Sequence, residues 1–268
     1  DTTTAESFVC YGDDLNSEQF EKVMNLLGAD LSKDQLIKVT IDDEKSLLGS
    51  IISADKIGSR SLSSARVTLT GEGTGISVTT QNINWVTSSM YSSALATAGV
   101  DNARIVVAAP VEVSGTAALA GILKAYESAA STQLSDEAKA VAGSEMVLTG
   151  DLADMIGSDD AVELLAMVKN AIAEYHLDDY DSLRPYVEQG AKQLGVQLTE
   201  DQIDQITKLG VQIAKLDLDP EKLAGQLNGL VDNIQKIQKV QQSADSIFTN
   251  IKTAVQGFFN WIGSWFKR

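Results

Sequence analysis

The longest regular pattern in the chain is an apolar stripe that begins after Pro220 and runs to the C-terminus without another proline. Its apolar residues, from Leu223 to Trp265, recur at steps of three or four positions, which is the spacing of one face of an α-helix and close to a 3.5-residue repeat. Asp219, followed by Pro220 at the first helical position, indicates where this helix begins. The pattern predicts a long amphipathic helix.

The stripe changes character near Phe248, because aromatic and basic residues replace leucine. Residues 246–268 are predicted to form an amphipathic C-terminal helix that binds a membrane surface or a protein partner. The residues expected to make this contact are Phe248, Ile251, Lys252, Val255, Phe258, Phe259, Trp261, Ile262, Trp265, Phe266, Lys267 and Arg268. Binding to a membrane interface, packing on the body of the protein and self-association as a coiled coil all stay open. Leu223 to Ala244 is expected to pack on the body, and the part after Ile247 to bind something else.

Strand signals lie in the first 131 residues, where β-branched residues alternate with polar ones. Ala65–Thr70 and Ile76–Thr80 flank a glycine-rich turn and predict a β-hairpin. Ala103–Ala108 predicts a buried strand, and Trp85–Ala98 has helical spacing that stops at Gly99. We therefore expect a small α/β domain over residues 1–131.

From Leu134 onward the chain carries helix signals and almost no strand signal. Helix starts are predicted at Ser135, Asp159 and Ser182, and Thr199 with Gln202 three positions later has the form of a capping box. We expect a helical region over residues 132–245. The predicted fold class is α+β.

Charge narrows the range of partners. The chain has 37 acidic and 21 basic residues, a net charge of −16, so a nucleic acid would meet long-range repulsion and we expect no such partner. The segment from Asn233 to Arg268 is the exception, with a local net charge of +4, and suits an anionic surface. No run reaches the ~18 consecutive apolar residues of a membrane-spanning helix.

Candidate chemistry is sparse. His176 is the only histidine and Cys10 the only cysteine, which excludes a zinc site of the usual Cys/His kind. His176 stands at a predicted helix exit, where a surface cap explains it, so we predict no catalytic residues. The acidic clusters lack the spacing of a calcium loop and are explained by helix capping and solvation. We predict no metal and no cofactor.

One helix start is a candidate anion site. Ser114, Gly115 and Thr116 precede the apolar run Ala117–Ala129, and a helix N-terminus with small residues and free N–H groups can hold an anion or a carboxylate. Simple capping of this helix is the alternative interpretation.

Several blocks between Ile57 and Glu127 resemble one protein family: IGSRSLSSA from Ile57, TGEGTGISV from Thr70, NINWVT, MYSSALATAGV, and AAPVEVSGTAALAGILKAYE ending at Glu127. The chain is similar there to the DUF1002 family, uncharacterised extracellular proteins of Gram-positive bacteria. The resemblance implies export and brings no established activity. The start of the chain at Asp1, with a polar threonine run, fits a mature protein after removal of a signal peptide.

We therefore expect an exported, non-enzymatic protein of the cell envelope or cell surface that attaches to a membrane or partner through its C-terminal helix. Two other functions stay open: a secreted hydrolase that uses carboxylates, and a protein that permeabilises membranes. A pocket lined by two facing carboxylates would favour the hydrolase.

Overall fold

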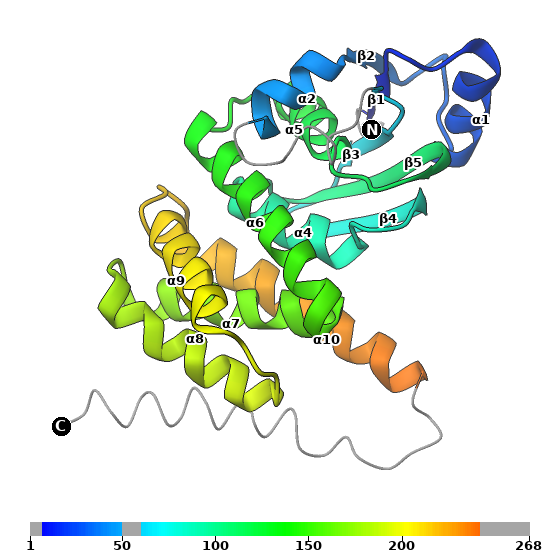
Figure 1. Cartoon of the computed structure of the whole chain (residues 1–268). Coiled ribbons are helices and arrows are strands. Elements are labelled where there is room, and N and C mark those ends of the chain that lie inside the picture. The colour runs from blue at the N-terminus through cyan, green and yellow to red at the C-terminus, as the bar shows by residue number, and fades with distance from the viewer. Residues whose placement is uncertain (1–6, 50–59, 242–268) are drawn as a thin grey trace.

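The structure is a computed structural model that describes residues 7–49 and 60–241. Within these residues five strands form one mixed sheet in the order β2-β1-β3-β5-β4 (Figure 1). The strands are β1 (Ser7–Gly12), β2 (Gln35–Val39), β3 (Ser64–Leu69), β4 (Ile76–Ile83) and β5 (Ala103–Val113). β1 runs parallel to β2 and β4 parallel to β5, while β3 is antiparallel to both of its neighbours. Helices α1 (Ser17–Leu27) and α4 (Ser88–Thr97) make the crossovers that these parallel pairs require.

The predicted β-hairpin is wrong, although both of its strands exist. β5 lies between β3 and β4, and pairs Ser64 with Ala108 on one side and Ile76 with Ala103 on the other. The glycine-rich segment passes over the start of β5, where Ala103 N donates to Gly75 O at 3.1 Å. β5 occupies an inner position of the sheet, where its apolar side chains are fully buried. A hairpin between β3 and β4 would have excluded β5 from this position.

Helices cover both faces of the sheet. Helix α1 packs on one face, where Val9 of β1 meets Val23 and Leu27. The alternate residues of β1, Phe8 and Cys10, point to the other face, which α4 and α5 (Ala118–Ala130) cover. Gly121 allows α5 to approach β1, because a Cβ there would stand 2.7 Å from the Cys10 sulfur.

The remaining helices lie on the α4 side of the sheet (Figure 1). They are α6 (Asp136–Ile156), α7 (Ser158–Tyr175), α8 (Tyr180–Leu194), α9 (Glu200–Ala214) and α10 (Pro220–Gln241), while the short α2 (Ile41–Leu48) packs beside α5 and α6. Met146, Val162 and Ile234 belong to the same buried cluster as Tyr91 of α4. The core of the sheet therefore continues through α4 into the helical region, and α8 and α9 add a second core against α7.

The predicted α+β fold class is confirmed: all strands of the described residues end by Val113, and only helices follow. The domain boundary at residue 131 stays a prediction. Among the helix starts, Ser135 caps α6, Thr199 and Gln202 form a capping box, and Asp219 accepts from two N–H groups of α10.

Two other predicted starts are displaced. Helix α7 begins at Ser158 after Gly157 and has no side-chain cap. Helix α8 is capped by Asp179, which accepts a hydrogen bond from Ser182 N at 2.9 Å. Where several capping residues stand in a row, the sequence does not say which of them will adopt the extended backbone that a cap requires.

Candidate functional site

Helix α10 docks on the body through its apolar stripe. Leu223, Leu227 and Ile234 are buried, with 5%, 0% and 2% of their surface exposed. Gln226 Nε2 also donates to Val100 O at 3.0 Å, so the helix is tied to the loop between α4 and β5. The first part of the predicted stripe therefore packs on the body, as expected.

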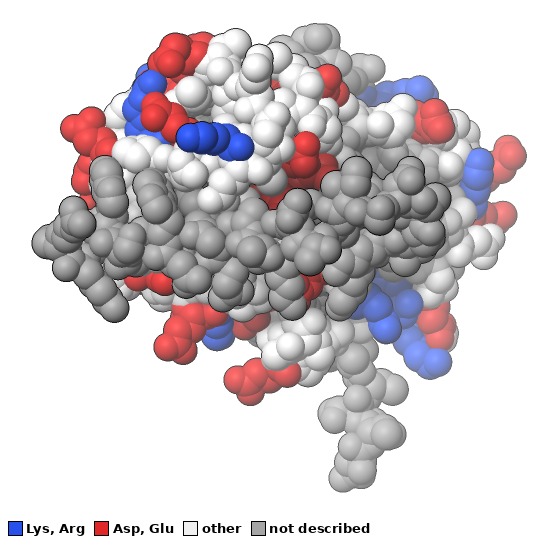
Figure 2. Space-filling model, turned by 90° about the horizontal axis from the view of Figure 1, so that it is seen from below, with Lys and Arg blue, Asp and Glu red and all other residues white. Residues whose placement is uncertain are grey.

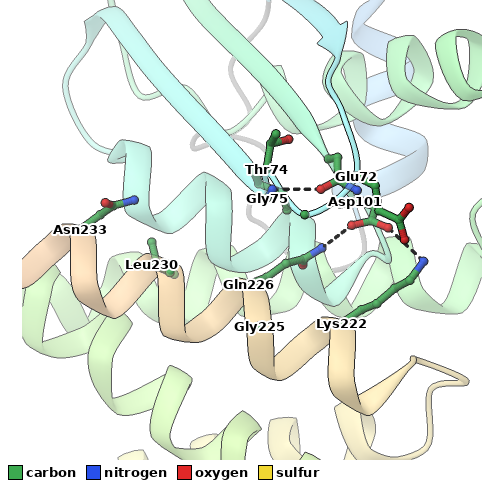
Figure 3. A pocket seen from close by; sticks show the side chains of 13 residues that line it. Glu72, Thr74, Gly75, Asp101, Lys222, Gly225, Gln226, Leu230 and Asn233 are labelled. Carbon is green, nitrogen blue, oxygen red and sulfur yellow. Dashed lines mark hydrogen bonds and ion pairs between the residues drawn. The ribbon is translucent and has the colours of Figure 1, made fainter.

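A groove opens beside the docked helix, between α10 and the turns at the amino ends of β4 and β5 (Figure 3). Its volume is about 360 Å³. Four glycines line it, two from the turn before β4 and two from α10: Gly73, Gly75, Gly225 and Gly229. A Cβ added at any of them would meet no heavy atom within 4 Å, so all four border open space.

The two pairs of glycines differ in what the backbone demands. Gly73 and Gly75 have φ angles of +78° and +70°, which favour glycine. Gly225 and Gly229 are helical and one turn apart, and alanine there would favour the helix by about 1 kcal/mol at each position. Neither local conformation nor packing explains these two glycines, and both border the groove.

An exposed ion pair lies at the end of the groove. Lys222 Nζ donates to Asp101 Oδ2 at 3.0 Å, and Gln226 Nε2 contacts Asp101 Oδ1 at 3.3 Å (Figure 3). The hydrogen bond to Asp101 raises the pKa of the Lys222 ammonium. On the turn side Asn102 Oδ1 accepts from Gly75 N at 3.0 Å. A second hollow of about 200 Å³ shares Asp101, Lys222 and Gln226 with the groove, so the ion pair stands between two cavities.

A second acid–lysine pair is sealed inside the protein, between α6 and α7 and beneath α4. Lys169 Nζ donates to Glu145 Oε1 at 2.7 Å and to Ser93 Oγ at 2.8 Å. Ser93 Oγ donates to Glu145 Oε1 at 2.6 Å, and the Thr97 hydroxyl donates to the other carboxylate oxygen. Burial lowers the pKa of Lys169 against the opposing attraction of Glu145. The pair is fully hydrogen-bonded, as a buried ion pair must be to persist.

Ser93 and Lys169 are residue types that serve elsewhere as a nucleophile and its base. Here both side chains are buried, at 1% and 0% exposure, and the Ser93 hydroxyl donates a hydrogen bond to the Glu145 carboxylate. A nucleophile needs a face open to substrate. This cluster is therefore built to hold three helices together.

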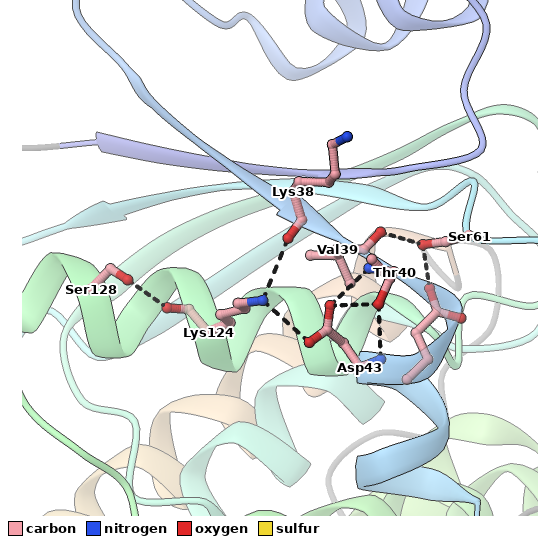
Figure 4. A network of polar contacts seen from close by, with 8 residues as sticks. Lys38, Val39, Thr40, Asp43, Ser61, Lys124 and Ser128 are labelled. Atoms are coloured by element: carbon pink, nitrogen blue, oxygen red, sulfur yellow. Dashed lines mark hydrogen bonds and ion pairs between the residues drawn. The ribbon is translucent and has the colours of Figure 1, made fainter.

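A third polar network joins the carboxyl end of β2 to α2, to α5 and to Ser61 before β3 (Figure 4). Glu44 is buried, and its Oε1 accepts from Ser61 Oγ at 2.6 Å while its Oε2 has no hydrogen-bond partner in the described part of the chain. Burial raises the pKa of Glu44 to about 7. Nearby, Lys124 Nζ contacts Asp43 Oδ1 at 3.2 Å. Lys124 thus pairs with the more exposed carboxylate.

The candidate anion site at the start of α5 is largely enclosed. Gly115 and Thr116 are buried, and Gly115 O accepts a hydrogen bond from the Tyr91 hydroxyl. The first helical residue is Ala118, and no side chain caps this helix, so the alternative interpretation of Ser114 to Thr116 as a helix cap is wrong. Gly115 has a φ of +91°, and a Cβ there would collide with Ile83 and Tyr91. The anion site itself stays a prediction.

Other candidates lie apart from the groove. His176 is exposed and ends α7 in the left-handed conformation, with its N–H bonded to Ile172 O at 2.9 Å, which is the surface cap that the sequence indicates. Within residues 7–49 and 60–241, no group of three His, Cys, Asp or Glu side chains gathers as a metal site would require. Within the same residues, no helix has both the length and the apolarity to cross a bilayer.

The predicted binding residues from Phe248 to Arg268 lie outside the residues that the structure describes.

On the face seen in Figure 2, the coloured acidic and basic side chains are interspersed rather than gathered by sign.

Sequence reasoning missed both the groove and the sealed pair. Lys169 is, with Glu163 and Asn170, one of three polar residues in an otherwise apolar stretch from Ala161 to Ala173. Gly225 and Gly229 stand inside a helix that they weaken. Each of these residues departs from the pattern around it, and this departure was the signal in the sequence that could have indicated the two sites. What such a residue contacts cannot be inferred from its own segment.

Comparisons with known proteins agree with the resemblance in the sequence. A family model described as a protein of unknown function, DUF1002, matches residues 11–230. The chain is 34% identical over 266 residues to the uncharacterized protein YpuA of Bacillus subtilis (strain 168), a match that covers 97% of this chain and 91% of that protein. No solved structure matches the chain.

Proposed function

The chain belongs to the DUF1002 family, whose function is unknown, and we propose that it is an exported, non-enzymatic protein of the cell envelope or cell surface. Its C-terminal segment, residues 246–268, is the proposed attachment element. The target is an anionic membrane surface, with a protein partner as the other outcome of the test.

The observation that carries this proposal is how α10 uses its apolar stripe. Leu227 and Ile234 are buried against the body, so this part of the stripe is already covered. In the sequence, the aromatic part of the stripe follows after Gln241 with the same spacing of apolar residues. It comes directly after a helix whose apolar residues are already packed on the body. An apolar face that continues beyond its own docking contact is suited to a second surface.

Charge supports the same assignment. The net charge of −16 is made of +4 from residues 233–268 and −20 from the rest of the chain. Basic residues near an anionic membrane contribute about 1 kcal/mol each, and the acidic body would be repelled from the same surface. The segment would therefore hold the protein at the membrane while the body stays in solution.

The polar chemistry of the body favours binding over catalysis. Its most nucleophile-like group, Ser93 beside Lys169, is sealed, and the only histidine of the chain is an exposed helix cap. One observation keeps a hydrolase as the second candidate: the carboxylates of Glu72 and Asp101 both line the groove. Hydrolysis of a glycoside or ester probe that is lost in Asp101→Asn would establish that alternative.

The attachment is tested by co-sedimentation with vesicles of phosphatidylglycerol and phosphatidylethanolamine. The full chain should sediment with them, less so at high salt, because the basic residues are screened within about 8–10 Å. Replacing Phe258 and Trp265 by Glu should abolish sedimentation without lowering the thermal midpoint of the body.

The matched control places the same two charges off the apolar stripe, as Thr253→Glu with Asn260→Glu. This variant should retain most of the binding, since it keeps the apolar face and differs only in where the charges stand. Retained binding by the Phe258 and Trp265 variant, together with a collapsed thermal midpoint, would instead identify the segment as part of the core.

A further inference from the structure

We propose that the groove between α10 and the glycine turn before β4 is a binding site for a neutral saccharide. This assignment does not depend on the C-terminal segment. It rests on three features of the groove: the two helical glycines, the hydrogen-bonding groups of its walls, and its charge.

The helical glycines keep the floor of the groove open. Gly225 and Gly229 are one turn apart on α10 and both border the groove, and a Cβ at either would enter empty space. Glycine is the poorest helix former after proline, so these positions favour an exposed backbone over helix stability. A flat strip of helix backbone without side chains admits a ring-shaped ligand at close range.

The walls supply donors and acceptors side by side. The carboxylates of Glu72 and Asp101 accept hydrogen bonds, and the Lys222 ammonium donates them. The side-chain amide of Asn233, also on the wall, does both. Within the described part of the chain, the side chains of Glu72 and Asn233 make no hydrogen bond, and the Glu72 carboxylate acts on Lys222 only through its charge. Sugar hydroxyls donate and accept at once, which matches this mixed set.

Charge and apolar surface select among ligands. Two carboxylates and one ammonium leave the walls net negative, which disfavours phosphates and other polyanions. Ile76 and Leu230 also line the groove and offer apolar contact to the C–H face of a sugar ring. The volume of about 360 Å³ falls in the range of about 300–1,000 Å³ of small-molecule sites. A short neutral saccharide satisfies all of these conditions.

The test uses the full chain in vesicle-free buffer, so that its outcome is separate from attachment by residues 246–268. Chitotriose, maltotriose and cellotriose are the neutral probes, and inorganic phosphate is the anionic comparison. Binding is followed by calorimetry and by amide NMR shifts. At least one saccharide should shift the amides of Gly73 to Ile76 and of Asn102, and phosphate should not.

Gly229→Leu fills the groove from the helix side and should weaken saccharide binding tenfold or more, with an unchanged or higher thermal midpoint. Asn228→Leu adds the same side chain at an exposed position of α10 that borders neither cavity, and should bind as the native chain does. Asp101→Asn tests the wall in the same way and should weaken binding severalfold. If none of the three saccharides shifts these amides, or if Gly229→Leu binds as well as Asn228→Leu, the assignment is overturned.

Discussion

Two of the acid–lysine pairs in this protein, one between α6 and α7 and one between α10 and the loop before β5, differ in their access to water. Glu145 and Lys169, 2.7 Å apart, are at most 1% exposed, whereas Asp101 and Lys222, 3.0 Å apart, are 32% and 62% exposed. The buried pair has a hydroxyl or carbonyl partner for each of its polar atoms, and the open pair borders two cavities. The same two functional groups thus hold helices together in one place and leave hydrogen bonds for a ligand in the other.

The difference follows from the cost of desolvation. A buried charge is tolerated only with complete hydrogen bonding, so the sealed cluster has one arrangement and no freedom to exchange partners. In the open pair, a hydrogen bond to water can replace the contact between the two charged groups at little cost in free energy. A hydrogen bond to a ligand can therefore replace that contact too. Exposure, rather than residue type, separates the structural pair from the candidate binding pair.

The largest effect should come from breaking the sealed pair. Lys169→Met leaves the Glu145 carboxylate buried without a cation and should reduce the free energy of unfolding by about 3–5 kcal/mol, measured by urea denaturation. Lys222→Met is the matched change in the open pair and should leave the urea midpoint nearly unchanged. Adding Glu145→Leu to Lys169→Met should recover much of the loss, and equal losses in the two single variants would break the comparison.

Glu44 extends the comparison of buried and exposed pairs to a buried carboxyl group that has no lysine partner in the described part of the chain. Its pKa is raised from 4.5 to about 7, so between these values the folded chain keeps a proton that the unfolded chain releases. The stability due to this group is complete below pH 4.5 and is lost as the pH rises through about 7. Glu44→Gln should therefore gain stability over the native chain as the pH rises, by on the order of 1–3 kcal/mol at pH 8. Parallel stability curves of the two proteins from pH 4.5 to 8 would contradict this expectation.

Substitution of a glycine that packs against a neighbouring side chain should lower stability, whereas substitution of a glycine that borders open space should raise it. Gly150 of α6 packs directly on the ring of Trp85, so a Cβ there collides with the indole. Gly150→Ala should therefore lower the free energy of unfolding by about 1–3 kcal/mol in thermal or urea denaturation. A stabilised variant would show that Trp85 can move aside without cost.

The smallest effect belongs to the open glycines. Gly225→Ala and Gly229→Ala should each stabilise the protein by about 0.5–1 kcal/mol, since alanine favours the helix and meets no neighbouring atom. Thermal midpoints of the single and double variants provide the measurement. Destabilisation by either alanine would mean that α10 is packed more closely there than the structure shows.

Local features of the sequence determined much of the secondary structure. Ser135, Thr199 and Asp219 mark helix starts because a capping side chain bonds the backbone within three residues of itself. The apolar stripe from Leu223 identified the docked face of α10, because helical periodicity reports which side chains share a face. The loss of strand signal after residue 131 was enough for the α+β class.

Only the tertiary structure decided which elements became neighbours. The insertion of β5 between β3 and β4 competes with a hairpin that the local turn chemistry favours, and the burial of Ile105 and Val107 decides it. Lys169 meets Ser93 across 76 positions of sequence, and Lys222 meets Asp101 across 121. Such contacts depend on the summed packing of many side chains, which no single segment encodes. For this reason local sequence signals located the capped starts of α6, α9 and α10 and the docked face of α10. The fold decided which acid–lysine pair is sealed and which is open to a ligand.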